Sequence, residues 1–264
     1  MIWLRSLLFN ILFFGLSTVM CIAIVPFVFC GKKTALFMAK FFTHQTYWLE
    51  KHIIGLDYEV RGLGNLPKEG PYIVAAKHQS AYETMKLHIL FKDPAIILKR
   101  ELTRIPVWGW FLSKLDMIAI NREKREKSMT SIIEGAQRMK DQGRPIIIFP
   151  QGTRVRIDMT AQQKPYKGGI IKMYNATGLP IIPLAMNSGM FWGRKTFIKR
   201  PGKVIFEFLP AIEPGLPEKK VIKALEERIE STSIRLMNEA KDQNPALQHL
   251  KIPIDYASEV PEHA

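Results

Sequence analysis

His78 and Glu83 are the two residues whose types and spacing point most directly to chemistry. The apolar run 71–76 predicts a short buried strand, and Ser80-Ala81-Tyr82-Glu83 has the S-x-x-E form that caps the start of a helix. His78 then lies on the connection between strand and helix, with Glu83 in the first helical turn. A carboxylate in that position can orient the imidazole of a general base. The alternative is that Glu83 serves only as the cap and that His78 is structural.

Three more sets of polar residues follow apolar runs that predict strands. They are Lys99 and Arg100 after 94–98, Arg122 at the end of 116–122, and Gln151, Gly152, Thr153 and Arg154 after 145–149. Ligands of open α/β sheets bind outside the carboxyl ends of the strands. Together with the His78 segment, these mostly basic sets predict a cleft for an anionic substrate.

These residues are positioned by strands that alternate with helical stretches. Strands are predicted over 57–61, 71–76, 94–98, 116–122, 145–149, 179–185 and 204–208, and amphipathic helices over 128–142 and from 217 to about 241. This alternation predicts an α/β fold with a central, mostly parallel β-sheet flanked by helices. The expected domain covers residues 56–242. A polar, proline-broken tail over 243–264 is expected to be loosely ordered.

The segment 1–55 differs from the rest in its hydropathy. No charged residue occurs between Leu7 and Cys30, and the stretch is long enough to span a hydrocarbon core. A cleavable signal peptide fits less well, because the stretch is long for one and no small residues mark a cleavage site. We therefore expect a retained membrane anchor, either a transmembrane helix or, given Gly15 and Pro26, a bent or re-entrant one.

The residues after this stretch suggest how it is oriented. Basic residues are more numerous after it than before it, which by the positive-inside rule places the domain in the cytoplasm at the inner membrane. The segment 34–54 mixes aromatic with polar and basic residues. It predicts either an amphipathic helix at the membrane interface or an ordinary helix packed on the domain.

The composition narrows the partners further. Thirty-eight Lys and Arg against 24 Asp and Glu give a net charge of +14, which suits nucleic acid, anionic lipid or phosphorylated substrates. The sequence has no zinc-finger spacing, RNP motif or clean helix-turn-helix pattern, so no nucleic-acid partner is expected. Cys21 and Cys30 cannot form a disulfide framework or a zinc site.

Five motifs in order, over roughly residues 70–185, resemble those of the glycerolipid acyltransferases, specifically the 1-acylglycerol-3-phosphate acyltransferases. They are His78-Gln-Ser-Ala-Tyr-Glu83, Lys99-Arg-Glu-Leu102 with Ile105-Pro-Val-Trp-Gly109, Ile120-Asn-Arg122, Phe149-Pro-Gln-Gly-Thr-Arg154, and Leu179-Pro-Ile-Ile-Pro183. Tyr166-Lys-Gly-Gly169 is similar to the segment that trails the fourth motif. The chain departs from the family at two positions: Glu83 stands for the usual Asp, and Gln151 for the usual Glu.

The resemblance implies roles for these residues. His78 would remove the proton of the acceptor hydroxyl while Glu83 fixes its tautomer, and the alcohol would attack the thioester directly. Lys99 or Arg100, together with Arg154 and Arg122, would hold a phosphate. Gln151 would hydrogen-bond either the acceptor glycerol or the loop backbone. Backbone amides near Gly152 or Ser80 would stabilise the oxyanion, with Thr153 in the same substrate-binding loop. No cofactor or metal is implied.

The expected reaction moves a fatty acyl group from acyl-CoA or acyl-acyl carrier protein to the sn-2 hydroxyl of lysophosphatidate. The product is phosphatidate, and the partners are membrane lipids. Three alternatives stay open at this point. The first is a relative that acylates another lysophospholipid, and the second is a membrane-tethered module that binds anionic lipids. The third is a metal-dependent hydrolase that uses His78, Glu83 and His88.

Overall fold

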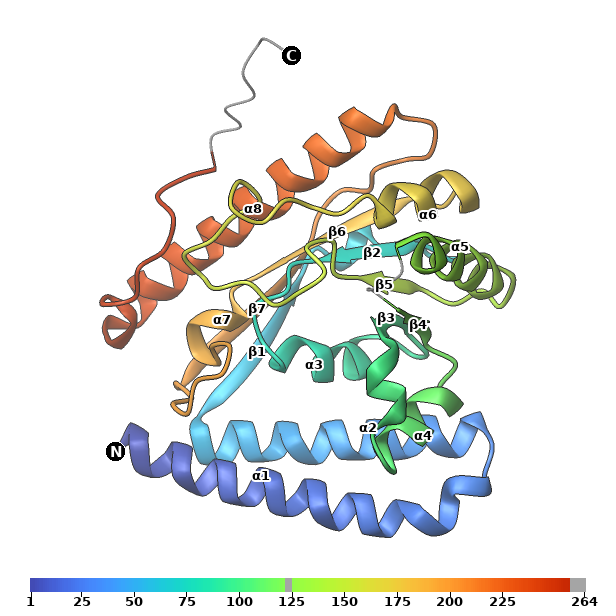
Figure 1. Cartoon of the computed structure of the whole chain (residues 1–264). Coiled ribbons are helices and arrows are strands. Elements are labelled where there is room, and N and C mark those ends of the chain that lie inside the picture. Colours follow the sequence, from blue (N-terminus) through green and yellow to red (C-terminus); the bar gives the residue numbers. More distant parts are fainter. Residues whose placement is uncertain (122–124, 257–264) are drawn as a thin grey trace.

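A computed structural model describes residues 1–121 and 125–256 of the chain, and Arg122 therefore lies outside the described residues. Figure 1 shows a central sheet with helices above and below it, and a hairpin of two long helices along one side. The helices are α1 (Ile2–Ile24), α2 (Lys32–Leu49), α3 (Tyr82–Leu90), α4 (Trp108–Lys114), α5 (Arg125–Asp141), α6 (Gly169–Thr177), α7 (Ser188–Phe191) and α8 (Glu218–Gln243).

The sheet has seven strands in the order β1-β7-β6-β2-β5-β3-β4. The five strands from β6 to β4 are parallel to one another, whereas β7 pairs with β6 in the antiparallel direction and β1 runs parallel to β7. The prediction of a mostly parallel sheet is confirmed. The bounds are β1 (Leu56–Arg61), β2 (Ile73–Ala76), β3 (Ala95–Lys99), β4 (Ile118–Ile120), β5 (Ile146–Ile148), β6 (Ile181–Met186) and β7 (Gly202–Phe208).

The two faces of the sheet are covered by different helices. Alternate residues of a strand point to opposite faces, so Val74 and Ala76 of β2 join one core cluster while Ile73 and Ala75 join the other. The first cluster includes residues of α1 to α4, and the second includes residues of α5, α6 and the first half of α8. Short helices α6 and α7 were not predicted, because neither begins with a side-chain cap that the sequence reveals.

The N-terminal segment forms an antiparallel helix hairpin. A 3₁₀ turn, Val25–Phe29, contains Pro26 and reverses the chain between α1 and α2. One face of α1 contacts the domain: Phe9 is fully buried against Trp192 with ring centroids 5.3 Å apart, and Ser6 Oγ accepts the Lys199 N–H at 3.0 Å. The stretch Ile2–Phe27 is also long and apolar enough to cross a membrane. Its outer face is exposed, with large apolar side chains at Ile11, Phe14, Val19 and Ile22.

A buried ion pair joins this hairpin to α3, the helix that carries Glu83. A single π-helical turn, Glu50–Ile54, follows α2 and brings Glu50 to Lys86 of α3, and both side chains are fully buried. Burial raises the pKa of Glu50 to about 7, against the effect of the Lys86 ammonium. Three tyrosine rings surround the Lys86 ammonium and form cation–π contacts with it. The distances from Lys86 Nζ to the ring centroids are 4.8 Å for Tyr47, 5.9 Å for Tyr58 and 4.5 Å for Tyr82.

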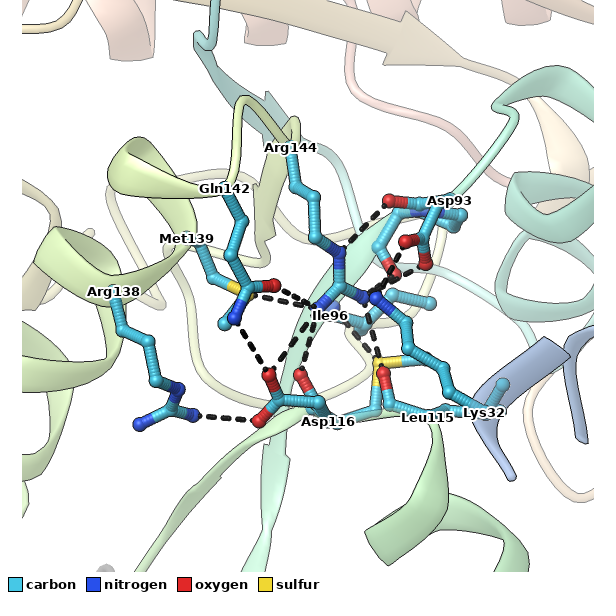
Figure 2. Close-up of polar contacts among 11 residues, drawn as sticks. Lys32, Asp93, Ile96, Leu115, Asp116, Arg138, Met139, Gln142 and Arg144 are labelled. Atoms are coloured by element: carbon cyan, nitrogen blue, oxygen red, sulfur yellow. Dashed lines mark hydrogen bonds and ion pairs between the residues drawn. The ribbon is translucent and has the colours of Figure 1, made fainter. Parts of the chain in front are cut away.

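A network of hydrogen bonds and ion pairs also connects the hairpin to the sheet, at the amino ends of β3 and β5 (Figure 2). The Arg144 guanidinium is nearly buried and donates to Asp93 Oδ1 at 2.9 Å, to the Leu115 carbonyl at 3.0 Å and to the Asp116 carbonyl at 3.2 Å. Lys32, at the start of α2, pairs with Asp93 Oδ2 at 2.6 Å. This network fixes the edge of the sheet opposite to the predicted site and attaches the hairpin to it.

The described part of the C-terminal tail packs on the domain. Residues Pro245–Leu247 form a 3₁₀ turn, and Leu247 is fully buried. Further on, Leu250, Ile252 and Tyr256 contact the core cluster that α1 to α4 share. The expectation of a loosely ordered tail is therefore wrong up to residue 256, because apolar side chains spaced among the polar ones find a surface to cover.

Candidate active site

The His78 and Glu83 side chains are in direct contact. Glu83 Oε1 lies 2.8 Å from His78 Nδ1, and Glu83 is fully buried while the His78 side chain is 16% exposed. A buried carboxylate accepts hydrogen bonds, so Nδ1 carries the proton and Nε2 is left as an acceptor. The pair therefore has the arrangement of a general base with its orienting partner.

Glu83 also caps the helix, so the two interpretations of this residue hold together. The same Oε1 accepts the backbone N–H groups of Gln79 at 2.8 Å and Ser80 at 2.7 Å. In return, Ser80 Oγ accepts the Tyr82 N–H at 3.1 Å, where α3 begins. The remaining oxygen, Oε2, accepts from Ser188 Oγ at 2.8 Å. Four donors thus fix one carboxylate.

The end of β5 forms the other wall beside His78. The Phe149 ring stacks on the imidazole with centroids 3.9 Å apart, and the Val155 N–H donates to the His78 carbonyl at 2.8 Å. Between them Gly152 adopts a φ of +68°, and its N–H donates to the Phe149 carbonyl at 2.8 Å. A side chain at this position would be strained, and its Cβ would lie 3.2 Å from the Lys167 side chain.

An apolar cavity of about 510 Å³ extends from this wall across the carboxyl ends of β5, β3 and β4. Phe149, which stacks on His78, and Gly152 form part of its wall, together with Tyr166. Isoleucines of three strands and of α5 line its depth: Ile97, Ile120, Ile148 and Ile132. The volume and the apolar lining of the cavity suit a hydrocarbon chain.

The predicted basic residues are distributed around this edge rather than gathered at His78. Lys99 and Arg100 are exposed at the end of β3. Arg100 lines a separate polar cavity of about 440 Å³ together with Asn121 and Lys127. Arg154 is half-buried after β5, and its carbonyl accepts from Arg194 Nη1 at 3.0 Å.

Gln151 and Thr153 differ in their surroundings. The Gln151 side chain is buried, and its Nε2 donates to the Lys164 carbonyl at 3.2 Å. It therefore bonds the loop backbone, one of the two roles expected for it. Thr153 is half-buried in the turn after Gly152.

Three backbone amides in the two segments expected to stabilise an oxyanion donate to other acceptors. The N–H groups of Gln79 and Ser80 donate to Glu83, and the Gly152 N–H donates within its own turn. The expectation therefore needs correction for these three donors. The reason is that the helix cap and the tight turn satisfy their own backbone first.

A buried network behind His78 was not predicted. Lys77 Nζ lies 2.7 Å from Glu230 Oε1 of α8, and Tyr166 Oη donates to the same oxygen at 3.0 Å. The Lys77 and Glu230 side chains are each 1% exposed. The network joins the residue before His78 to Tyr166, which lines the apolar cavity. The position of Lys77 directly before His78 suggests that Lys77 lies near the site, but nothing in the sequence identifies Glu230 as its partner.

The structure separates His88 from His78. His88 lines a different apolar cavity of about 260 Å³ between α2, α3 and α4, and burial lowers its pKa to about 4. Among the residues that the structure describes, no group of three or more His, Cys, Asp or Glu side chains is placed to hold a metal ion. The metal-dependent hydrolase therefore lacks a ligand set in this part of the chain.

A family model described as acyltransferase matches residues 57–187. A 1-acyl-sn-glycerol-3-phosphate acyltransferase of Pseudomonas aeruginosa is 33% identical over 202 residues, which are 76% of this chain and 77% of the relative. The chain belongs to the acyltransferase family. The matched region contains every residue of the site described above from His78 to Arg154.

Two further comparisons agree with this family assignment. The 1-acyl-sn-glycerol-3-phosphate acyltransferase of Saccharomyces cerevisiae is 26% identical over 262 residues, 97% of this chain and 84% of the relative. The crystal structure of the 1-acyl-sn-glycerophosphate acyltransferase PlsC of Thermotoga maritima superposes with a TM-score of 0.70 at 23% identity, over 89% of this chain and 99% of that one. The likeness to the latter shows that this acyltransferase shares its fold.

Proposed function

We propose that this acyltransferase transfers a fatty acyl group to the free sn-2 hydroxyl of 1-acylglycerol-3-phosphate and so forms phosphatidate for phospholipid synthesis. The observation that carries the proposal is the 2.8 Å contact of His78 Nδ1 with buried Glu83, beside an apolar cavity and within the matched region. The printed names of the bacterial and yeast relatives supply the acceptor.

The reaction follows from the contact of His78 Nδ1 with Glu83, which leaves Nε2 to face the substrate. Nε2 removes the proton of the acceptor hydroxyl as its oxygen attacks the thioester carbonyl, and Glu83 stabilises the imidazolium that forms. The ester C–O bond then forms, the C–S bond breaks, and the imidazolium returns its proton to the thiolate. No protein nucleophile is needed. The two cysteines, Cys21 and Cys30, lie at the far end of the hairpin.

The substrates are assigned to the surroundings of His78 by their chemistry. The apolar cavity suits an acyl chain, because burying apolar surface is favourable and its lining includes four isoleucines, Met129 and Phe149. Arg154 follows Gly152 by two residues in the segment after β5 and is assigned to the acceptor phosphate, since a guanidinium can bond two phosphate oxygens. Lys99 and Arg100, and Arg122 outside the described residues, are assigned to the same anion as it enters from the β3 side.

The hairpin is proposed to hold the enzyme on the membrane. The exposed face of α1 consists of large apolar side chains, whereas its other face is attached to the domain by Phe9 and Ser6. This arrangement suits a hairpin embedded in a lipid layer beside the domain. Lys32, Lys33 and Lys40 on α2 favour the anionic cytoplasmic surface of the inner membrane.

The test is release of free thiol from acyl-CoA by detergent-purified protein, with lysophosphatidate and a panel of other lysophospholipids as acceptors. We expect release that depends on lysophosphatidate, and a loss of about 10²–10⁴-fold in the His78→Ala variant. A chelator serves as a control and should leave the rate unchanged. Release by His78→Ala at the wild-type rate would contradict the mechanism. A preference for another lysophospholipid would contradict the proposed acceptor.

A further inference from the structure

Another cavity, of about 470 Å³, lies beside the catalytic motif and is lined by none of the residues assigned above. Gln79, the neighbour of His78, forms part of its wall, and Gln79 Oε1 accepts the Gly189 N–H at 3.1 Å. It is lined by five basic side chains: Arg156, Arg194, Arg200, His249 and Lys251. We refer to this cavity as the basic cleft.

Most of the positive charge in the basic cleft is not compensated. Arg156 is paired with Asp158 at 2.6 Å. Within residues 1–121 and 125–256, in contrast, Arg194, Arg200 and Lys251 form no ion pair with an acidic side chain. Partial burial also lowers the pKa of Arg200, as expected for a cation without an acidic partner. Three uncompensated cations in one cavity fit an anion of more than one charge.

The loop that carries two of these cations is held in place by α1. Asn10 Nδ2 donates to the Phe197 carbonyl at 3.3 Å, and Ser6 Oγ accepts the Lys199 N–H at 3.0 Å. Arg194 is held from the other side, where its Nη1 donates to the Arg154 carbonyl. A cleft whose walls are fixed before binding loses less conformational entropy when a ligand enters.

We propose that the basic cleft binds the phosphates of the nucleotide end of coenzyme A in the acyl donor, an inference that rests on the proposed acyl transfer. Coenzyme A carries several phosphate charges on an adenosine, joined to the thioester by a long, flexible arm. Its charged end therefore binds apart from the reacting carbonyl, as the position of the cleft beside Gln79 requires. The apolar side chains of Val155, Ile157 and Leu250 in the same wall suit the adenine ring.

The acceptor suits this cleft less well. Lysophosphatidate carries a single phosphate on a short glycerol, so its phosphate must lie close to the hydroxyl that His78 deprotonates. Arg154 is placed for that role after Gly152, and the polar cavity of Arg100 lies on the β3 side. The basic cleft and the basic residues Arg154 and Arg100 outside it thus correspond to two anionic substrates.

The experiment compares Arg200→Gln and Lys251→Gln with wild type, since neither side chain makes an ion pair that folding would lose. Lys195→Gln is the matched control, because it removes the same charge from an exposed position of the same loop outside the cleft.

Binding of free coenzyme A is measured by calorimetry, and KM is measured for each substrate at saturating levels of the other. We expect each cleft variant to weaken coenzyme A binding and raise the acyl-CoA KM about 10-fold. The KM for lysophosphatidate and the Lys195→Gln protein should stay within about twofold of wild type, the size of effect expected for an exposed charge.

Three outcomes would overturn the proposal. One is a rise in the lysophosphatidate KM alone, which would assign the cleft to the acceptor. Another is a loss of transfer from acyl-acyl carrier protein without any change in coenzyme A binding, which would assign it to the carrier protein. The last is no difference between the cleft variants and Lys195→Gln. Wild-type protein that binds coenzyme A in the cleft but releases no thiol would refute the proposed function and leave the cleft assignment standing.

Discussion

Ser188 Oγ donates to Glu83 Oε2 at 2.8 Å, and this bond joins the residue that begins α7 to the first turn of α3. It explains how glutamate can stand where the family usually has aspartate. The longer side chain folds back so that Oε1 reaches His78 and two backbone N–H groups, and Ser188 holds the other oxygen in place. Ser188 lies one residue past the region matched by the family model.

Replacing Ser188 by alanine should slow turnover without unfolding the protein. The bond goes to an ionised carboxylate, and such a hydrogen bond is worth about 1.5–3 kcal/mol, which corresponds to roughly 10- to 150-fold in kcat. The three donors to Oε1 remain, so α3 keeps its cap. Ser233→Ala is the matched control, because Ser233 is also a buried helical serine and its Oγ has no hydrogen-bond partner among the residues that the structure describes. Equal kcat values for Ser188→Ala and the control would show that the bond does not orient the active carboxylate.

The Glu83→Gln variant tests whether the charge of this carboxylate is needed. Its amide oxygen can still accept the backbone N–H groups of Gln79 and Ser80, so the melting temperature should change little. The neutral amide cannot stabilise the His78 imidazolium, so we expect kcat to fall at least as far as in Ser188→Ala. Thiol release and thermal melting are measured on the same preparation. Normal turnover in this variant would leave Glu83 with the role of helix cap only.

The sheet and the order of the motifs could be predicted from the sequence because each depends on local pattern. Apolar runs such as 145–149 mark buried strands, and parallel strands that end in polar residues place these at one edge. The partners of the site could not be predicted in this way. Ser188 is 105 residues from Glu83, and Glu230 is 153 residues from Lys77, so only the folded chain brings them together. A single serine or glutamate carries no sign of such a contact.

The sequence also could not predict how the apolar N-terminal segment folds, for a different reason. Length and hydropathy of the stretch from Leu7 to Cys30 fit a spanning helix and a hairpin equally well. The packing of α1 on the domain depends on contacts that the sequence pattern does not show, such as Phe9 with Trp192 and Ser6 with Lys199. Gln151 is a similar case, because its burial depends on the Lys164 carbonyl of a loop that has no regular pattern.

His88 should make the protein less stable in mild acid. Burial lowers its pKa from 6.5 to about 4, so the unfolded chain binds more protons than the folded one between these values. Above pH 6.5 His88 does not lower the free energy of unfolding. As the pH falls from 6.5 to 4, its contribution lowers that free energy by about 3 kcal/mol in total. In the part of the chain that the structure describes, its Nδ1 has no hydrogen-bond partner, so His88→Leu should remove this loss without leaving a polar group unpaired.

The measurement is the free energy of unfolding in urea at pH 7 and pH 5, for wild type and His88→Leu in the same detergent. As the pH falls from 7 to 5, the free energy of unfolding should decrease more in wild type than in His88→Leu. Glu50 acts in the opposite sense, because its raised pKa of about 7 makes stability fall as the pH rises from 4.5, but this contribution is shared by both proteins. A difference between the two proteins that is independent of pH would contradict the assignment to His88.

The outer face of α1 should attach the enzyme to lipid. Ile11, Phe14 and Ile22 are each at least 60% exposed, so glutamate at these positions leaves the contacts of Phe9 intact. We expect the triple glutamate variant to lose co-flotation with vesicles of mixed neutral and anionic lipid, whereas triple leucine replacement should retain it. Deleting 1–30 is a poorer test, since it also uncovers Trp192. Full co-flotation of the glutamate variant would assign attachment to the exposed aromatic side chains of α2 instead.

The Arg154→Lys variant tests whether Arg154 binds the phosphate of lysophosphatidate, as proposed, while the basic cleft binds coenzyme A. Lysine keeps the charge but loses the planar fork that bonds two phosphate oxygens, and the carbonyl that holds Arg194 is unchanged. We expect kcat/KM for lysophosphatidate to fall about 10- to 150-fold, and the acyl-CoA KM to stay near that of wild type. Arg138→Lys is the control, because its exposed ion pair with Asp116 lies at the opposite edge of the sheet. If Arg154→Lys instead raises the acyl-CoA KM, Arg154 belongs with the basic cleft, and the acceptor phosphate must be held from the β3 side by Arg100.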